Sequence, residues 1–329
     1  MEQEAQKYLD MLELPIKANR KIKSLRIGEQ QMVEIAKALS LNARILIMDE
    51  PTSALTSKEI DRLFGIIKSL KEKGVGIIYI SHRLEELQDI ADRVTIMRDG
   101  KFITRGEFKD MRMDEIIKNM VGREIKEKFP RVSMPRGKKI FSIKNLSAGK
   151  MVRDVSFDVY EGEILGIAGL MGAGRTESTR ALFGVDAKNG GTIELDGKEI
   201  FVNCPTDAIR QGVVLAPEDR KKDGLCTKLS IKENIALPNL DILCNRFGII
   251  DRKKEEAMLD NAVKRLSLKM AGGDKDAASL SGGNQQKLVV AKWLLRESRV
   301  IIFDEPTRGI DVAAKVEIYN LMNKLKREG

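Results

Sequence analysis

The spacing of apolar and polar residues predicts alternating helices and strands over the first part of the chain. A helical spacing favours helices over residues 1–23 (closing in a turn), 30–41, 58–73 and 84–91, and short apolar runs favour strands over 45–48 and 76–81. The run at 45–48 is entirely apolar, which indicates a buried strand. Residues 93–106 alternate around Asp99-Gly100, a pair typical of a tight hairpin turn. Strands that alternate with helices indicate a parallel α/β sheet.

A different pattern follows residues 128–139, which carry two prolines and a basic skew without periodicity, and which we interpret as a linker. Short alternating segments over 139–146, 152–160 and 192–202 predict antiparallel strands. Residues 163–184 predict a strand, a glycine loop and a helix in that order. Further on we expect mostly helix over 230–279, a helix after Asn284, a strand over 300–303 and a last helix over 313–326.

Two stretches of the chain repeat with a constant offset of 255 residues. SLRIGEQQMVEIAKALS at 24–40 resembles SLSGGNQQKLVVAKWLL at 279–295, and ARILIMDEPTSALT at 43–56 resembles SRVIIFDEPTRGID at 298–311. Such an offset is too long for a solenoid and indicates two homologous domains in tandem. The glycine-rich stretch at Gly169 has no counterpart earlier in the chain, and that of His82 would lie beyond Gly329. We therefore expect the C-terminal half of one domain over 1–127, a linker over 128–139, and a second domain over 140–329 without its C-terminal end.

The composition indicates a globular, reduced protein with a basic balance. It is 42% hydrophobic and 33% charged, and no apolar run approaches the roughly 18 residues of a membrane helix. The three cysteines are scattered, which favours a reducing compartment. The net charge of +9 arises from basic residues that are interleaved with acidic ones. We interpret this charge as solvated helix faces, and we expect no nucleic acid as a partner.

The stretch GLMGAGRT at 169–176 predicts a phosphate-binding loop. In the pattern G-x-x-x-x-G-K-[ST], glycines let backbone N–H groups converge on phosphate oxygens at a helix N-terminus. The lysine of that pattern is Arg175, which keeps the charge but is longer and planar, so catalytic competence is in doubt. The alternative is a glycine turn for close helix packing. The candidate nucleotide-binding residues here are Gly169, Gly172, Ala173, Gly174, Arg175, Thr176 and Glu177, and Thr176 is also a candidate Mg²⁺ ligand.

Each repeated apolar strand ends in an Asp-Glu pair. Because ligands bind at the carboxyl edge of α/β sheets, Asp49 and Asp304 are candidate Mg²⁺ partners. Glu50 and Glu305 are candidate catalytic groups that position or deprotonate an attacking water. His82, the single histidine, follows the next strand and is expected at the same edge near a γ-phosphate. The alternatives are turn or cap carboxylates and a structural histidine.

Besides the phosphate loop, a further candidate anion site lies at the beginning of a predicted helix. Its residues share a hydroxyl, free backbone N–H groups or an amide at a helix N-terminus: Ser281, Gly282, Gly283, Asn284 and Gln285.

Taken together, these motifs resemble an ATP-binding-cassette ATPase, specifically the tandem-cassette ATPases of bacterial monosaccharide importers for ribose, galactose or xylose. The resemblance covers nearly the whole chain, including IMDEPTSALT, GIIYISHRLEEL, PEDRKKDGL and LSGGNQQK. It implies an α/β P-loop NTPase fold with two cassettes in tandem, each with a parallel α/β core, an antiparallel β subdomain and a helical subdomain, the first incomplete. ATP and Mg²⁺ are the implied cofactors.

The resemblance implies two unequal sites, because each nucleotide lies between one cassette and the Ser-Gly-Gly segment of the other. Asp49, Glu50 and His82 would work with the intact segment at 281–285 and hydrolyse ATP. The second phosphate loop would face the altered segment at Arg26, with weak or no turnover. Glu218 stands where the family has Gln, and the stretch at 146–157 has no aromatic residue at the position where family cassettes stack adenine.

The family's implied role is to power sugar import from the cytoplasmic face of the membrane. Its partners would be transmembrane permease subunits and, through them, an extracytoplasmic sugar-binding protein. Two alternatives remain: a non-transport cassette protein acting on ribosomes or nucleic acid, and a nucleotide-binding or regulatory module that hydrolyses nothing. The sugar is not specified by the sequence.

Overall fold

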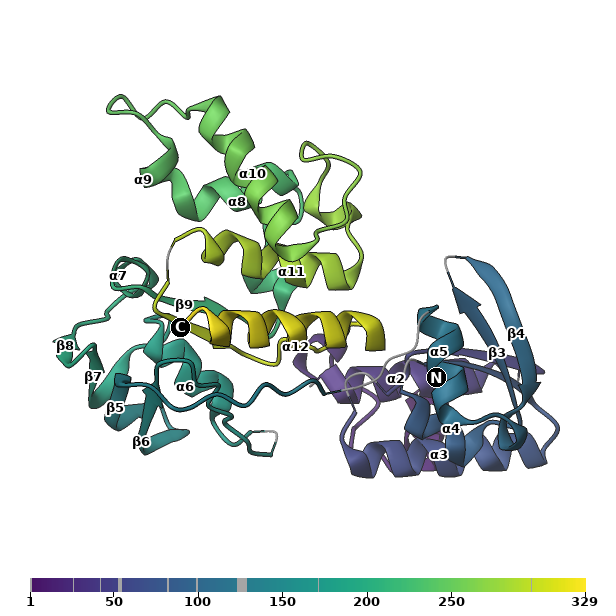
Figure 1. The fold of residues 1–329 in the computed structure, drawn as a ribbon. Coiled ribbons are helices and arrows are strands. Elements are labelled where there is room, and N and C mark those ends of the chain that lie inside the picture. The colour runs from purple at the N-terminus through teal and green to yellow at the C-terminus, as the bar shows by residue number, and fades with distance from the viewer. Residues whose placement is uncertain are drawn as a thin grey trace. The chain divides into compact units, whose positions relative to one another are not determined.

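The computed structural model describes residues 2–25, 27–41, 43–52, 55–81, 83–98, 100–122, 129–170, 172–296 and 298–329, apart from the side chains of Ile27 and Ser57. The chain divides into two compact units, Met1–Lys126 and Glu127–Gly329 (Figure 1). Each unit has a hydrophobic core of its own.

Unit 1 combines a small parallel sheet, helices and a hairpin. Its elements are α1 (Glu2–Met11), α2 (Ile27–Ser40), β1 (Ile45–Asp49), α3 (Ser57–Glu72), β2 (Gly76–Ile80), α4 (Leu84–Ile90), β3 (Arg93–Arg98), β4 (Lys101–Glu107) and α5 (Met113–Val121), with short 3-10 turns at Ile22–Ser24 and Phe108–Asp110. β1 and β2 pair in parallel, as the alternation predicts. β3 and β4 form the expected antiparallel hairpin, and α5 packs on β3.

The core of unit 1 lies between α1, α2, α3 and one face of the β1–β2 sheet. Leu12, Met32 and Leu63 are fully buried there. α3 begins with a capping box in which the Glu59 carboxylate accepts from the Thr56 backbone N–H. This arrangement satisfies donors that the first helical turn leaves without partners.

The expectation that residues 45–48 form a fully buried strand is wrong. Leu46 and Met48 are buried, but Ile45 and Ile47 are 64% and 63% exposed. Side chains alternate across a strand, and within the described residues this sheet has only two strands with one face covered. Ile78 and Ile80 of β2 are half exposed as well.

Unit 2 begins with an antiparallel sheet in the strand order β6-β5-β7-β8. Its strands are β5 (Lys139–Ala148), β6 (Val152–Tyr160), β7 (Lys188–Leu195) and β8 (Lys198–Ile200), and the loop between β6 and β7 carries α6 (Arg175–Leu182). The antiparallel pairing expected from the alternating pattern is confirmed. Phe141, Ile143, Leu146 and Ile193 are almost fully buried and form part of a core that reaches α6.

The second half of unit 2 adds two parallel strands and a group of helices. Its elements are α7 (Pro205–Arg210), β9 (Val213–Ala216), a π-helical turn (Arg220–Gly224), α8 (Ile231–Ala236), α9 (Leu240–Leu243), α10 (Arg252–Leu266), α11 (Gly282–Leu294), β10 (Val300–Phe303) and α12 (Val312–Arg327), with 3-10 turns at Leu237–Asn239 and Ala277–Ser279. β9 and β10 pair in parallel. Figure 1 shows α8, α9 and α10 grouped beyond α11, on the far side from the antiparallel sheet.

α11 forms the centre of unit 2. Its side chains from Gln285 to Ala291 are all buried, in a core shared with α8, α10 and β9. Trp293 at its end packs edge-on against Phe183, which joins the helical core to the core of the antiparallel sheet. A helix buried on all sides is held more rigidly than an amphipathic surface helix.

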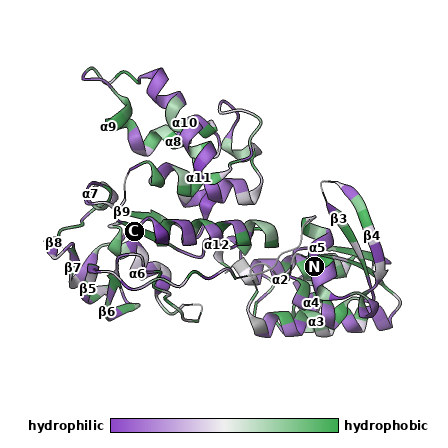
Figure 2. Cartoon of the chain, viewed as in Figure 1, coloured by the Kyte–Doolittle hydropathy of each residue, from purple (hydrophilic) through white to green (hydrophobic). Residues whose placement is uncertain are grey.

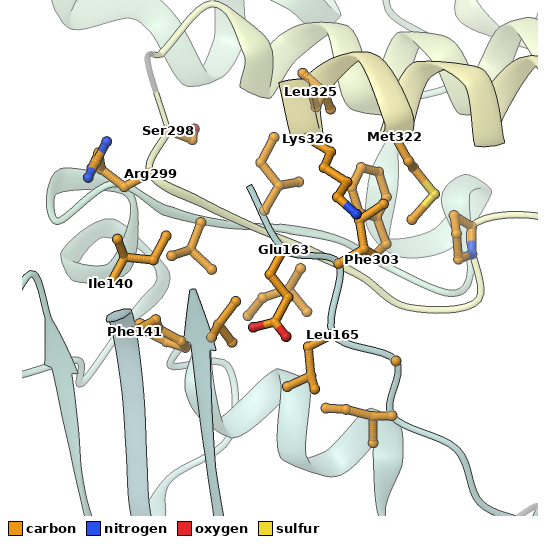
Figure 3. Close-up of a pocket in the computed structure, with 18 of the residues that line it drawn as sticks. Ile140, Phe141, Glu163, Leu165, Ser298, Arg299, Phe303, Met322, Leu325 and Lys326 are labelled. Atoms are coloured by element: carbon orange, nitrogen blue, oxygen red, sulfur yellow. The ribbon is translucent and has the colours of Figure 1, made fainter. Parts of the chain in front are cut away.

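The strand predicted at the beginning of residues 163–184 is absent. Residues 163–169 carry no strand, whereas the loop and α6 follow as expected. A cavity of ≈ 700 Å³ separates this segment from β10 and is lined by Leu165, Phe303 and Met322, among others (Figure 3). A strand requires a neighbour for its backbone groups, and among the described residues β10 is paired with β9 alone.

Within the part of the chain that the structure describes, no helix has the length and apolar character needed to span a bilayer. Hydrophilic and hydrophobic residues alternate along α3 and α12, as Figure 2 shows.

Candidate functional site

Two described glycines in the loop before α6 adopt backbone conformations that favour glycine. Gly172 and Gly174 adopt positive φ angles of 81° and 86°, which residues with a side chain rarely tolerate. A Cβ on Gly174 would lie 3.2 Å from the Met151 carbonyl oxygen, and one on Gly169 would lie 3.0 Å from the Ala173 Cβ. Gly174 caps α6, so the loop leads directly into a helix N-terminus. The glycines therefore serve both close packing and an anion-accessible backbone.

The arginine in the lysine position is joined to the candidate catalytic carboxylate of the same unit. Arg175 Nη2 donates to Glu305 Oε1 at 3.0 Å, and the two side chains are 32% and 41% exposed. A pair this exposed contributes only about 1 kcal/mol or less, so a phosphate group can replace the carboxylate at little cost. Glu177, the next acidic residue on α6, is half-buried.

A second polar contact joins Thr176 to Glu218, the position at which the family has glutamine. The Thr176 hydroxyl donates to Glu218 Oε2 at 3.3 Å. Glu218 also forms an ion pair with Arg308, which follows the second Asp-Glu-Pro-Thr sequence. Glu218 is thus engaged on two sides, and its carboxylate joins the phosphate loop to the segment after β10.

Asp304 is the buried carboxylate of this site. It is 6% exposed and accepts a hydrogen bond from the Thr179 hydroxyl at 3.3 Å. One long hydrogen bond leaves acceptor capacity on a buried carboxylate, which fits a Mg²⁺ ion carried by a nucleotide. No group of three or more metal-binding side chains occurs among the described residues. Mg²⁺ that is held largely by phosphates and water does not need one.

Both Asp-Glu pairs share an unusual backbone conformation. Glu50, directly after β1, has a φ of 46°, and Glu305, two residues after β10, has a φ of 43°. The left-handed region is uncommon for glutamate and costs of order 1 kcal/mol or more. Because the two residues are equivalent positions of the repeat, the strain is a shared property of the motif. Strain kept at the carboxyl edge of a sheet points to a functional site.

Near Asp49 and Glu50 lies a buried carboxylate that no sequence motif indicates as a functional residue. Glu86 on α4 is 8% exposed and accepts hydrogen bonds from the Thr52 hydroxyl at 2.7 Å and the Tyr79 hydroxyl at 2.9 Å. It also accepts from Ser81 and pairs with Arg83. Burial and the neighbouring Glu86 carboxylate raise the pKa of Tyr79. These contacts, here called the Glu86 cluster, connect the residues that follow β1 and β2 to α4.

Two candidate residues, His82 and Arg26, lie outside the described residues. Asp49 ends β1 with an exposed side chain, and Glu50 is half-buried and donates its backbone N–H to the Ile80 carbonyl. The structure therefore joins β1 and β2 at the edge where the sequence predicts them to meet.

The segment at 281–285 begins α11 in the predicted way. Ser281 is the exposed N-cap, and its hydroxyl accepts from the Asn284 side chain at 2.9 Å. A Cβ on Gly283 would lie 2.7 Å from the Ala314 Cβ, so this glycine allows α11 to approach α12. A Cβ on Gly282 would lie 2.9 Å from Arg220 Nη2. Both glycines therefore have packing roles in addition to the predicted anion site.

Arg220 is a further residue that sequence reasoning missed. It donates to the Arg308 carbonyl oxygen at 2.8 Å and to the Gly309 carbonyl oxygen at 2.9 Å, and it lies 3.4 Å from Gln285 Oε1. Burial lowers the pKa of its guanidinium. In the sequence Arg220 belongs to a short basic run, Arg220–Lys222, which gives no sign of these contacts.

Comparison with known proteins supports the fold and the motifs. The ABC transporter family matches residues 1–53 and 152–308, which is more than half of the chain. The chain belongs to the ABC transporter family. A ribose import ATP-binding protein of Lacticaseibacillus paracasei is 50% identical over 325 residues, and one of Bacillus subtilis is 49% identical. A putative ribose/galactose/methyl galactoside import ATP-binding protein of Agrobacterium fabrum is 49% identical over 327 residues.

These three relatives are longer than the chain. It is matched over 99% of its own length but spans only 65% to 66% of theirs. Among solved structures, a nucleotide-free ATP-binding cassette from an ABC transporter matches 58% of the chain with a TM-score of 0.50 and 20% identity. The structure of RNase-L inhibitor matches 98% of the chain with a TM-score of 0.63 and 23% identity. At sequence identities of 20% and 23%, these two structures are evidence for the fold alone.

Proposed function

We propose that this chain is part of an ATP-hydrolysing subunit that powers import of a simple sugar. The observation that carries the proposal is the repeated left-handed glutamate, Glu50 and Glu305, at the ends of equivalent strands. The names of the relatives supply the substrate class: ribose in two cases and ribose, galactose or methyl galactoside in the third. Permease subunits in the membrane, and through them an extracytoplasmic sugar-binding protein, are the proposed partners, with the subunit on the cytoplasmic face.

In this proposal the described residues of unit 2 hold a nucleotide but turn it over poorly. The backbone of Gly172–Thr176 and the N-terminus of α6 bind phosphate oxygens, while Asp304 and Thr176 hold the accompanying Mg²⁺. Bound Mg²⁺ supplies charge neutralisation of the phosphates. Arg175 stands in the lysine position of the loop and pairs with Glu305 in this structure, so a bound phosphate would have to displace that carboxylate. Exposed Met151, next to the glycine loop, offers an apolar contact in place of a stacking aromatic residue.

Hydrolysis is assigned to the edge formed by Asp49 and Glu50, with His82 near the γ-phosphate. Glu50, which has a left-handed backbone directly after β1, orients and deprotonates the attacking water. The segment Ser281–Gln285 is proposed to contribute its hydroxyl and N–H groups to a nucleotide phosphate. Positioning of water by a carboxylate contributes roughly 10²- to 10⁴-fold to the rate.

The test compares two conservative changes in the complete polypeptide encoded at the locus. We expect Glu50→Gln to lower ATP hydrolysis by about 10²- to 10⁴-fold. Glu305→Gln is expected to change it by less than about threefold, because this edge is proposed to turn nucleotide over poorly and its pair with Arg175 is weak. Equal losses in both variants would contradict the asymmetric assignment. Loss in neither would contradict hydrolysis at these edges altogether.

A second candidate role, nucleotide binding without turnover, is favoured for unit 2 by the Arg175–Glu305 pair. Binding of a fluorescent ATP analogue that persists in Glu305→Gln and is lost in Gly174→Val would support it. Valine cannot readily adopt the φ of 86° found at Gly174.

A further inference from the structure

A continuous line of polar contacts runs from the phosphate loop of unit 2 to the beginning of α11. Its first contact joins the Thr176 hydroxyl to Glu218, and its second is the ion pair between Glu218 and Arg308. The backbone carbonyl groups of Arg308 and Gly309 then accept hydrogen bonds from Arg220. The last contact joins Arg220 to Gln285 on α11.

Arg220 is the residue that joins the two halves of this line. Its guanidinium is planar and carries donors on three nitrogens, so it can serve two carbonyl groups and an amide oxygen at once. Lysine has a single ammonium and cannot reproduce this fork. The space that the guanidinium occupies exists because residue 282 is glycine, whose Cβ would lie 2.9 Å from Nη2 and 3.2 Å from the Gly309 carbonyl oxygen.

The packing of α11 makes this contact consequential. The helix is buried from Gln285 to Ala291, so its first turn cannot shift without a change at the residues that touch it. Gln285 is 3% exposed, and its amide group also donates to the Ala277 carbonyl oxygen at 3.3 Å. Arg220 therefore provides a polar contact between the buried Gln285 and the segment that follows β10.

We propose that Arg220 is a positioning residue that transmits changes at the Thr176–Glu218 contact to the Ser281–Gln285 turn of α11. The functional importance of this coupling rests on the proposed function, in which both ends of the line bind nucleotide. The polar contacts themselves do not depend on that proposal. Occupancy of the phosphate loop would alter the Thr176–Glu218 contact and thereby the order of the turn.

The experiment measures backbone amide hydrogen exchange at Gln285–Leu288 without nucleotide. In the wild-type background, Glu218→Ala is expected to raise these exchange rates about fivefold, the lower end of couplings between separate sites. In an Arg220→Met background the same change is expected to have no effect. The proposal is overturned if Glu218→Ala has no effect in the wild type, or if its effect is equal in both backgrounds.

Two further variants separate positioning from general stability. Arg220→Lys keeps the charge and stem but not the fork, so it is also expected to abolish the response, and it serves if Arg220→Met does not fold. Arg296→Lys is the matched control, because Arg296 also binds a carbonyl group and a carboxylate, Pro238 and Asp241, near the other end of α11. It is expected to lower stability while retaining the fivefold response. Since no nucleotide is used, failure here is distinct from failure of the Glu50 assignment.

Discussion

The carboxyl edges of the two parallel sheets carry the same Asp-Glu-Pro-Thr sequence in different surroundings. In unit 2, Glu305 is paired with Arg175 and Asp304 is buried beside Thr179. In unit 1, Asp49 is exposed and the segment continues into Thr52, which donates to the buried Glu86. The glutamate has a left-handed backbone in both, although Asp49 lies within β1 and Asp304 follows the end of β10. The comparison teaches that the repeated motif keeps the conformation of its glutamate, while its neighbours decide which of its groups are available.

The Glu86 cluster gives the largest expected stability effect. Glu86→Ala should lower the free energy of unfolding of unit 1 by about 3 kcal/mol, because the Thr52 and Tyr79 hydroxyls lose their buried acceptor. Glu85→Ala changes the exposed neighbour on the same helix and is the matched control. Chemical denaturation followed by circular dichroism measures both. Equal, small effects would show that the edge of unit 1 is not ordered by this cluster.

A lysine at equivalent positions of the repeat sharpens the comparison. Lys292 on α11 is buried, donates to the Gly224 carbonyl oxygen, and has its pKa lowered to about 8 by burial, whereas its counterpart Lys37 on α2 is exposed. Between about pH 8 and the ordinary lysine pKa of about 10.4, the unfolded chain therefore binds more protons than the folded one. The contribution of Lys292 to stability should rise by about 2 kcal/mol from pH 8 to pH 10.

The measurement is the difference in unfolding free energy between wild type and Lys292→Met at each pH. This difference should change along that range, and Lys37→Met, at the exposed counterpart, is measured in parallel as the matched control. A pH-independent difference for Lys292→Met would mean that this lysine does not titrate with folding.

Substitution of Gly283 tests whether the Ser-Gly-Gly segment has a packing role. Gly283→Ala should destabilise unit 2 by about 1–2 kcal/mol, because its Cβ would lie 2.7 Å from that of Ala314. Gly272→Ala is the control, since no atom lies within 4 Å of the added Cβ. Thermal unfolding of both variants decides the matter. Neutral behaviour of Gly283→Ala would indicate that α11 and α12 separate easily.

The smallest expected effect concerns the cavity beside β10. In unit 1, α3 is followed by Gly74 and then by β2, which pairs in parallel with β1. In unit 2, α12 is followed by Gly329, which has a positive φ like Gly74 and lines the cavity. Appending the sequence of residues 75–81 after Gly329 should stabilise unit 2 by about 1 kcal/mol, since apolar burial only slightly exceeds the cost of ordering. An appended segment with its isoleucines changed to serine is the control. If both extensions behave alike in denaturation, the cavity does not receive a strand.

The sequence by itself determined most of the helices and strands and the repeat, because these depend on local periodicity and on short motifs, but it did not predict β9, α5 or α7. It also located the glycine loop and both Asp-Glu edges, since these residues lie at the ends of predicted elements. Only the tertiary structure decided which groups meet. Arg175 and Glu305 are 130 residues apart, and Arg220 and Gly309 are 89 apart. Periodicity carries no information about such contacts, because they depend on how the elements pack.

The same limit explains the two wrong expectations. An apolar run is compatible with a strand that is buried on one face or on two, and Ile45–Met48 has neighbours on only one. A strand pattern at residues 163–169 does not become a strand unless another strand lies beside it, and a cavity lies there instead. Sequence states what each segment can form, whereas the neighbours supplied by the fold determine whether its backbone groups and apolar side chains find partners.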